Sequence, residues 1–538
     1  MGQNARTDEE HSTARRAEIL HFQYYDTSDS SPKQIYKDLL SVEEIRNLRV
    51  VPLAFNDSQL IFGILNNTAP STINNLKDRF NDKIVQFNLI SETGFKEYLD
   101  LYDPPPKVEY QEIEINSADQ NEQIKQISSI LLQVNAQDML AYLVEQAHRL
   151  NASDIHIETK RDNVLIRYRI DGVLHPIAEI NYDKYRVLIG AIASQANIST
   201  SSRAAQQGHI SQRVKMANDS LVDVNVRVES VQTINSMDVV MRLFNLKRDM
   251  YNLDRLGLNE AERKNVDQII AQPTGLVMIV GPTGSGKTTT LYSMINALSS
   301  SAKKIITIED PVEYQFNDIT QISVNNSDPQ AEGSFADNLK AILRLDPDIL
   351  MVGEIRDNET AKIALQAALT GHLVLTTFHA GSSSAALTRL YEIIGQNTLF
   401  TSSIRLVMAQ RLVRALDDST KQPYHPQESE FNLIKDIVNT LPDHVEKPSL
   451  DNLQLYRSVS TESNPFGYKG QLAIREQFIL TPKVSDVINN SSRKPTTAEI
   501  ESAARDEGMI TMKQDAILKV IAGQTTLDEV LRVLGLDD

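Results

Sequence analysis

Short apolar runs and alternating apolar and polar residues divide the chain into segments of different character. Residues 1–30 show no such pattern and predict a flexible tail. From 31 to 103 the pattern predicts a small α+β domain, which we interpret as a docking module without chemistry of its own. Its predicted strands are 49–55, 59–65 and 84–90, and its predicted helices are about 70–80 and 92–101.

A proline-containing acidic stretch at 104–124 predicts a linker to a second α+β domain, 125–248. This domain should begin with an amphipathic helix near 136–150 and continue as a mostly antiparallel sheet. Its predicted strands are 154–158, 164–170, 173–174, 222–228 and 239–243.

Residues 249–415 alternate apolar runs with helical stretches, which is the pattern of an α/β domain with a parallel sheet. The composition becomes polar after Leu416, so much loop is expected over 417–465, and the last residues return to helices. We therefore expect a helical C-terminal domain over 416–538. Thr526 and Glu529 predict a capping box for its last helix.

The clearest chemical signal is the glycine-rich stretch 281–288, between a predicted buried strand at 276–280 and a predicted helix at 288–296. Its glycines allow backbone N–H groups to turn inward around a triphosphate, and the helix N-terminus adds partial positive charge. Lys287 would reach the β- and γ-phosphates, and Thr288 would hold Mg²⁺. The residues predicted to bind the nucleotide are Gly281, Pro282, Thr283, Gly284, Ser285, Gly286, Lys287, Thr288 and Thr289.

Three later apolar runs end in polar residues, and ligands of an open parallel sheet bind beyond the carboxyl ends of its strands. Glu354 follows the run 349–352 and could orient or deprotonate the attacking water, or hold Mg²⁺ through water. Its alternative is a salt bridge with Arg356. The run 305–308 leads into an acidic segment that could anchor metal-bound waters, or simply form a turn at a proline. Its carboxylates are Glu309, Asp310 and Glu313.

Two histidines flank the run 373–377. His379 follows it and could sense the γ-phosphate through a hydrogen bond. His372 precedes the run, where a purely structural hydrogen bond is an equal alternative.

Phosphoryl transfer also needs positive charge near the γ-phosphate. Arg227 and Arg242 lie on predicted strands of the preceding domain, where Arg227 points away from the face of its alternating valines and Arg242 interrupts the apolar run 239–243. They could close over ATP as fingers, and the alternative is a pair of interdomain salt bridges.

The composition of the chain argues against several classes of protein. The formal charge is −17, from 54 basic and 71 acidic residues, which argues against a protein whose main task is to grip nucleic acid. There is no cysteine, and therefore no disulfide or thiolate metal site. No signal core or membrane-length apolar run is present, so we expect a cytoplasmic protein that meets a membrane only through partners.

Together these motifs resemble the type II/type IV secretion superfamily of traffic ATPases, the GspE/PilB group, strongly over 125–415. The resemblance rests on the stretches 152–158, 167–172, 281–288, 308–313, 346–357 and 370–379. It implies a RecA-like P-loop core and a hexameric motor that hydrolyses ATP with Mg²⁺. Such a motor drives an inner-membrane platform protein, with pilus accessory proteins, to add pilins to a filament.

Motif matching implies a role for each candidate residue. Lys287 and Thr288 match the Walker A motif, Glu354 the Walker B glutamate, and Glu309 and Glu313 the acidic box. His379, with His372, matches the histidine box, and Arg227 and Arg242 match the paired arginines.

Departures from the family sharpen this interpretation. Relatives of the type II secretion kind carry a four-cysteine zinc motif after the stretch 409–414, which this chain lacks, so no zinc is expected. The sequence thus predicts a motor for type IV pilus assembly. A type II secretion or DNA-uptake motor, a non-hydrolysing scaffold ring and a nucleic-acid translocase remain alternatives.

Overall fold

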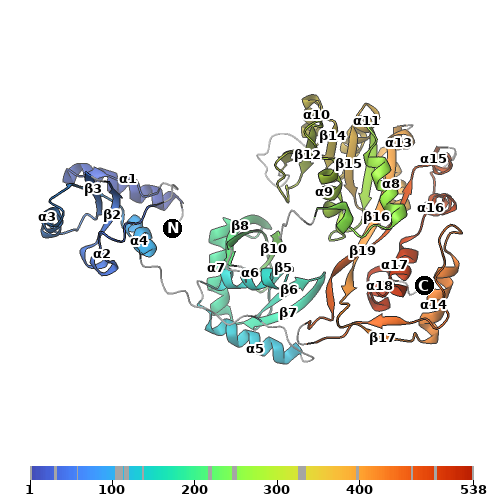
Figure 1. Ribbon diagram of the computed structural model, residues 1–538, viewed down its shortest axis with the longest axis horizontal. Helices are drawn as coiled ribbons and strands as arrows, with labels where there is room; N and C mark the ends of the chain where they lie inside the picture. The colour runs from blue at the N-terminus through green and yellow to red at the C-terminus, as the bar shows by residue number, and fades with distance from the viewer. Residues whose placement is uncertain are drawn as a thin grey trace. The chain divides into compact units, whose positions relative to one another are not determined.

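The computed structural model describes two compact units, Met1–Gln111 and Glu112–Asp538 (Figure 1). The described residues are 3–28, 33–56, 58–102, 113, 120–135, 138–215, 221–244, 251–324, 335–395, 399–461, 464–489 and 494–535. Among them, no helix combines the length and apolar character needed to cross a bilayer.

The first unit is a small sheet with helices packed on it. Its elements are α1 (Gln3–Leu20), β1 (Gln23–Tyr24), α2 (Val42–Leu48), β2 (Val50–Phe55), β3 (Gln59–Ile64), α3 (Pro70–Arg79), β4 (Ile84–Leu89) and α4 (Glu92–Tyr102). The strand order is β1-β4-β3-β2, and buried Leu60, Phe62 and Tyr98 belong to its core. Strands β2, β3 and β4 and helices α3 and α4 confirm the predicted elements.

The prediction of a flexible tail over 1–30 is wrong for the described residues, because α1 belongs to the first unit. The buried Glu10 carboxylate accepts hydrogen bonds from Tyr24 Oη (2.6 Å), Thr27 Oγ1 (2.7 Å) and Ser91 Oγ (2.8 Å). Ala17 joins the apolar core. These partners lie elsewhere in the sequence, so the polar composition of α1 gave no sign of them.

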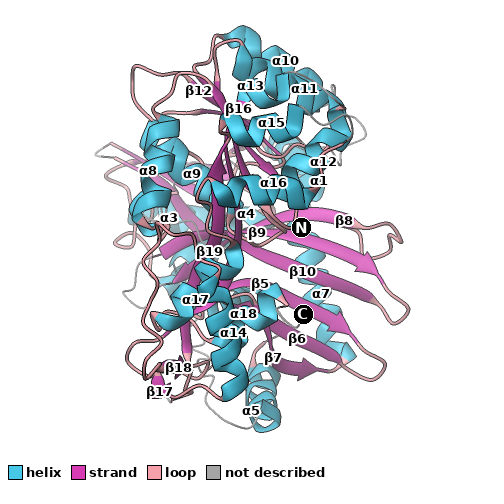
Figure 2. Ribbon diagram, turned by 90° about the vertical axis from the view of Figure 1, so that its right-hand side faces the viewer, coloured by secondary structure: helices cyan, strands magenta, loops and turns pink. Residues whose placement is uncertain are grey.

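The second unit begins with an antiparallel sheet, as predicted. Its elements are α5 (Gln120–Gln133), α6 (Met139–Arg149), β5 (Ala152–Thr159), β6 (Val164–Ile170), β7 (Val173–Ile180), α7 (Tyr182–Ala196), β8 (Gln206–Lys215), β9 (Leu221–Gln232) and β10 (Met237–Phe244). The strand order is β7-β6-β5-β10-β9-β8, with all neighbours antiparallel (Figure 2). The predicted linker 104–124 lies mostly outside the described residues, and its end is helical because α5 begins at Gln120.

The core of the second unit is a larger sheet in the order β13-β12-β14-β15-β11-β16-β19, parallel except for the pair β16 and β19. These strands are β11 (Gly275–Val280), β12 (Ile305–Glu309), β13 (Thr320–Ser323), β14 (Ile349–Val352), β15 (Leu373–Phe378), β16 (Ile404–Leu416) and β19 (Tyr468–Ile479). The surrounding helices are η2 (Leu253–Arg255), α8 (Glu260–Ile270), α9 (Lys287–Leu298), α10 (Phe335–Ile342), η3 (Leu343–Leu345), α11 (Asn358–Leu369), α12 (Ser383–Ile394) and α13 (Leu399–Ser403).

Helices cover both faces of this sheet, which is why its strands β11 and β14 are apolar and fully buried. Leu276, Met278 and Val280 of β11 join a core with α10, α11 and α12 on one face. Val277 and Ile279 point the opposite way and join a core with α8 and α9. The α/β prediction for this region is therefore confirmed.

The predicted separate C-terminal domain, 416–538, is instead continuous with the core. Its elements are β17 (Gln422–Tyr424), α14 (Glu428–Asn439), β18 (Leu455–Arg457), β19, α15 (Pro482–Asn489), α16 (Thr497–Asp506), α17 (Met512–Ile521) and α18 (Leu527–Leu534). Strand β19 extends the core sheet, and residues of α14, α16 and α17 lie in the same apolar cluster as β11. The predicted capping box is half present: Thr526 caps α18, but the Glu529 side chain binds Arg414 and Arg532.

Candidate nucleotide-binding site

The glycine-rich loop joins β11 to α9 at the carboxyl edge of the core sheet. Gly284 and Gly286 have φ angles of 77° and 82°, a conformation that side chains disfavour. The loop turns back on itself, so that Lys287 Nζ donates to the carbonyl oxygens of Gly281 (2.9 Å) and Pro282 (2.8 Å). The ammonium group therefore lies within the loop, where such lysines meet the β- and γ-phosphates.

Charges from other strands reach this lysine. Burial lowers the pKa of Lys287, while the carboxylates of Glu354 and Glu313 act to raise it. The structure thus brings together three residues that sequence analysis placed in one site.

Sequence analysis missed a residue that supports the loop from behind. Gln410 is buried on β16, the neighbour of β11. Its Nε2 donates to Ser285 O (2.7 Å), and its Oε1 accepts from Thr290 Oγ1 (2.9 Å). The stretch 409–414 had been noted only as a family marker, although a polar residue within an apolar strand was a usable signal.

Glu354 follows β14 and lies between the side chains of His379 and Arg356. Its Oε1 is 3.1 Å from His379 Nε2, and its Oε2 accepts from Arg356 Nε at 3.0 Å. The salt bridge with Arg356 is therefore present. It does not exclude a catalytic role, because Arg356 is 56% exposed and exposed ion pairs bind weakly.

Glu309 and Glu313 of the acidic segment face different partners. Buried Glu309 accepts hydrogen bonds from the hydroxyls of Tyr292 and Thr307 and from Gln321 Nε2 (3.3 Å). Burial raises its pKa, and these hydrogen bonds oppose the rise. Glu309 is thus held by neutral donors of its own domain.

Glu313 instead belongs to the phosphate end of α9. Its side chain reaches solvent, and the Thr288 hydroxyl beside it acts to lower its pKa. Partial loss of water contact and the charge of Glu309 raise its pKa, whereas the charges of Arg242 and Arg227 lower it. The third acidic residue, Asp310, lies 3.3 Å from Arg356 Nη1.

Arg227 and Arg242 are cross-strand partners on β9 and β10. Arg242 Nε donates to Asp154 Oδ1 (2.9 Å), and Arg227 Nε lies 3.2 Å from Glu229 Oε1. These ion pairs lie within the antiparallel sheet, and Arg242 remains 49% exposed. Both guanidinium charges also act to lower the pKa of Glu313.

The two histidines occupy opposite ends of β15. His379 lies at the carboxyl end beside Glu354. His372 lies at the amino end, where its Nδ1 is 3.0 Å from Ala367 O. Six strand residues place these ends roughly 20 Å apart, so the structure brings His379 but not His372 to the loop.

The site also fits Mg²⁺. Among the described residues there is no group of three or more His, Asp and Glu side chains that could hold a metal ion. A phosphate loop needs no such group, because Mg²⁺ there takes one hydroxyl, phosphate oxygens and waters. The Thr288 hydroxyl, in the first turn of α9 beside Glu313, is suited to this task, with Glu354 acting through water.

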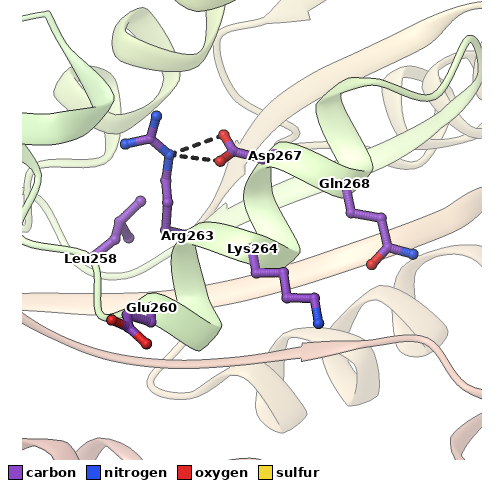
Figure 3. Close-up of a pocket in the computed structure, with 6 residues that line it drawn as sticks. All are labelled: Leu258, Glu260, Arg263, Lys264, Asp267 and Gln268. Atoms are coloured by element: carbon purple, nitrogen blue, oxygen red, sulfur yellow. Dashed lines mark hydrogen bonds and ion pairs between the residues drawn. The ribbon is translucent and has the colours of Figure 1, made fainter.

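A separate hollow of about 700 Å³ runs along α8 (Figure 3). Within it, Arg263 forms an ion pair with a residue of the same helix, since its Nε donates to both carboxylate oxygens of Asp267 at 3.0 and 2.9 Å. The residues that line it are Leu258, Glu260, Arg263, Lys264, Asp267 and Gln268, none of which is a candidate site residue.

Comparisons with known proteins agree with this geometry. The family model of the type II/IV secretion system proteins matches residues 133–532. Type II secretion system protein E of Pseudomonas aeruginosa is 38% identical over 392 residues, 73% of this chain and 74% of that protein. Type IV pilus assembly ATPase PilB of Thermus thermophilus is 34% identical over 398 residues, 74% of this chain and 42% of PilB.

A solved structure supports the fold. The Legionella pneumophila ATPase DotB superposes with a TM-score of 0.53 at 24% sequence identity, over 74% of this chain and 95% of DotB. This likeness confirms the RecA-like α/β core. The matched family model and the 38% identical relative establish that the chain belongs to the type II/type IV secretion superfamily of traffic ATPases, the GspE/PilB group.

Proposed function

We propose that this chain hydrolyses ATP and, as a hexamer at the inner face of the cytoplasmic membrane, powers type IV pilus assembly through a platform protein and pilus accessory proteins. One observation carries the enzymatic part. Lys287, Glu354 and Glu313 come from three separate segments, yet both carboxylates act on the same ammonium group. A cation and two carboxylates that converge at a phosphate loop can bind the phosphates and position the attacking water, as phosphoryl transfer requires.

Each residue then has a task. The loop amides and Lys287 hold the β- and γ-phosphates, while Glu354 accepts a proton from the water that attacks the γ-phosphorus. His379 and Arg356 orient the Glu354 carboxylate. When bound at Thr288 and, through water, at Glu354, Mg²⁺ would neutralise charge on the β- and γ-phosphate oxygens. Arg227 and Arg242 add positive charge as the bond to ADP breaks.

The absence of cysteine supports pilus assembly over secretion, because a four-cysteine zinc subdomain cannot form in this chain. The opposing observation is the 38% identity to a protein named for type II secretion. Deleting the gene in its own organism separates the two. Loss of surface pili with normal protein secretion supports pilus assembly, and the reverse supports secretion.

ATP turnover by the full chain tests the enzymatic part. We expect the wild type to release phosphate and to be a hexamer by light scattering in the same samples. Glu354→Gln should lower the rate of phosphate release on the order of 10²-fold or more and keep ATP binding. Glu359→Gln is the matched control: it makes the same replacement of a carboxylate by a carboxamide at an exposed position on α11, and it should behave like the wild type. Equal rates in Glu354→Gln and the wild type would contradict the assignment, and a wild-type ring without turnover would favour the scaffold alternative.

A further inference from the structure

Helix α9 carries polar residues at three successive turns of one face: Thr288, Tyr292 and Asn296. The Thr288 hydroxyl acts to lower the pKa of the Glu313 carboxyl beside it. Asn296 Nδ2 donates to Tyr251 O (2.8 Å), in the segment that leads into η2. This face therefore connects the phosphate end of the helix to the acidic segment and to the chain that enters the core.

Tyr292 lies at the centre of this face, and its hydroxyl both donates and accepts a hydrogen bond. The hydroxyl donates to Glu309 Oε2 and accepts from the backbone N–H of Glu313 at 3.2 Å. One oxygen atom thus holds both ends of the acidic segment. Burial, and secondly the charge of Glu309, raise the pKa of Tyr292, so the hydroxyl keeps its proton at neutral pH.

The ring of Tyr292 is fully buried among other aromatic rings. It meets Tyr251 edge-on with ring centroids 5.2 Å apart, and Phe316 with centroids 5.3 Å apart. Such packing fixes the ring and leaves the hydroxyl little freedom. The position of the hydroxyl is therefore set by the core and not by the loop it holds.

We infer that Tyr292 is a positioning residue for ATP hydrolysis, whose hydroxyl fixes the acidic segment 309–313 against the phosphate-binding helix. Without it, one Glu309 oxygen and the Glu313 N–H lose a shared partner inside the protein, and the segment can move. Glu313 then no longer stays beside Thr288, and displacements of about 1 Å at such sites can lower rates about 10²-fold. This inference rests on the proposed ATP hydrolysis.

Tyr292→Phe tests it by removing the hydroxyl and keeping the ring. We expect kcat for ATP to fall roughly 10-fold or more, while KM and the affinity for a fluorescent ATP analogue change less than about threefold. Tyr251→Phe is the matched control. It removes a hydroxyl from the adjoining ring but keeps the ring contacts and the carbonyl that Asn296 binds, and should leave kcat within about twofold of the wild type.

A double-mutant cycle with Glu309→Gln asks whether Tyr292 acts through the acidic segment. Adding Tyr292→Phe to Glu309→Gln should lower kcat by a smaller factor than Tyr292→Phe does in the wild type, because only the bond to the Glu313 N–H remains to be lost. Wild-type kcat in Tyr292→Phe, an equal fall in both backgrounds, or a loss of affinity at constant kcat would each overturn the inference.

Two further outcomes are distinguishable. If Tyr292→Phe does not fold, Glu309→Gln alone must reproduce the fall in kcat at constant KM, and failure to do so overturns the inference. A wild-type chain without turnover overturns both this inference and the proposed function, whereas wild-type turnover that Tyr292→Phe retains overturns the inference alone.

Discussion

The pKa values of glutamates shift in opposite directions in two regions of the second unit. At the nucleotide site, burial raises the pKa of Glu309, and partial loss of water contact raises that of Glu313. Where α18 meets β16, burial also acts to raise the pKa of Glu529, but hydrogen bonds from Arg532 and Arg414 lower it to about 2. Arg414 Nη2 lies 2.5 Å from Glu529 Oε1.

This difference indicates that Glu529 stabilises the fold, whereas the glutamates of the nucleotide site serve catalysis. Glu529 is matched by two guanidinium groups of its own chain, so its charge is already compensated. Charge compensation at the nucleotide site is incomplete, and incomplete compensation is typical of sites that receive charged ligands. Substitutions in the two regions should therefore affect different measurements.

Lys287→Ala should have the largest effect, lowering ATP turnover about 10³-fold because the phosphates lose their main cation. The fold should survive, with an unchanged circular dichroism spectrum. Lys303→Ala, an exposed lysine between α9 and β12, is the control and should keep wild-type turnover. Near-normal turnover of Lys287→Ala would contradict the assignment of Lys287 to the nucleotide site.

Glu529→Gln should instead lower the free energy of unfolding, on the order of 3 kcal/mol at pH 7. The folded pKa of about 2 lies below the ordinary glutamate pKa of 4.5, so the stabilisation is complete above about pH 4.5 and is lost as the pH falls toward 2. Denaturant unfolding of wild type and variant should therefore converge between pH 5 and pH 2. The exposed Glu428→Gln is the control, and parallel pH curves for Glu529→Gln and the wild type would contradict the comparison.

Arg227→Ala should lower turnover on the order of 10²-fold in the assembled ring, with ATP affinity changed less than about threefold. Fluorescent-nucleotide binding and phosphate release measure the two effects separately. Arg186→Ala, on α7 of the same domain and 74% exposed, is the matched control. If both affinity and turnover of Arg227→Ala equal those of the wild type, Arg227 is not a finger.

The two histidines of β15 give the smallest and most local comparison. His379→Asn should slow turnover roughly 10-fold, because the carboxylate of Glu354 loses an orienting partner. His372→Asn should leave turnover within about twofold and cost about 1 kcal/mol of stability. Equal losses of turnover in the two variants would show that a histidine at the carboxyl end of β15 matters no more for ATP turnover than one at the amino end.

The sequence predicted those parts of the site that depend on local pattern. A phosphate loop needs its glycines, lysine and hydroxyl in fixed order, and strands β12, β14 and β15 begin where their apolar runs were expected. The direction of a side chain at a strand end is not local information. Glu309 turns toward Tyr292 because an aromatic core lies there, and no spacing in the sequence records that core.

Pairing across long distances was also beyond local pattern. Strand β19 follows the polar stretch 417–465 and no sequence pattern predicted it, yet it pairs with β16 from Leu406 to Leu416. Helix α1 reads as a polar tail, yet Glu10 meets its partners across the first unit. In both cases the stabilising partner, and not the segment itself, determines the structure.

The position of β16, between β11 and β19, has a consequence for biosynthesis. The strand that carries the nucleotide loop leaves the ribosome long before β19 does, so the sheet stays incomplete through much of translation. During that interval β16 has an open edge, and open edges pair readily with other chains. A nascent motor of this kind would therefore benefit from chaperone protection until residue 479 emerges, and a chain that stops at Leu416 should aggregate rather than persist as a smaller ATPase.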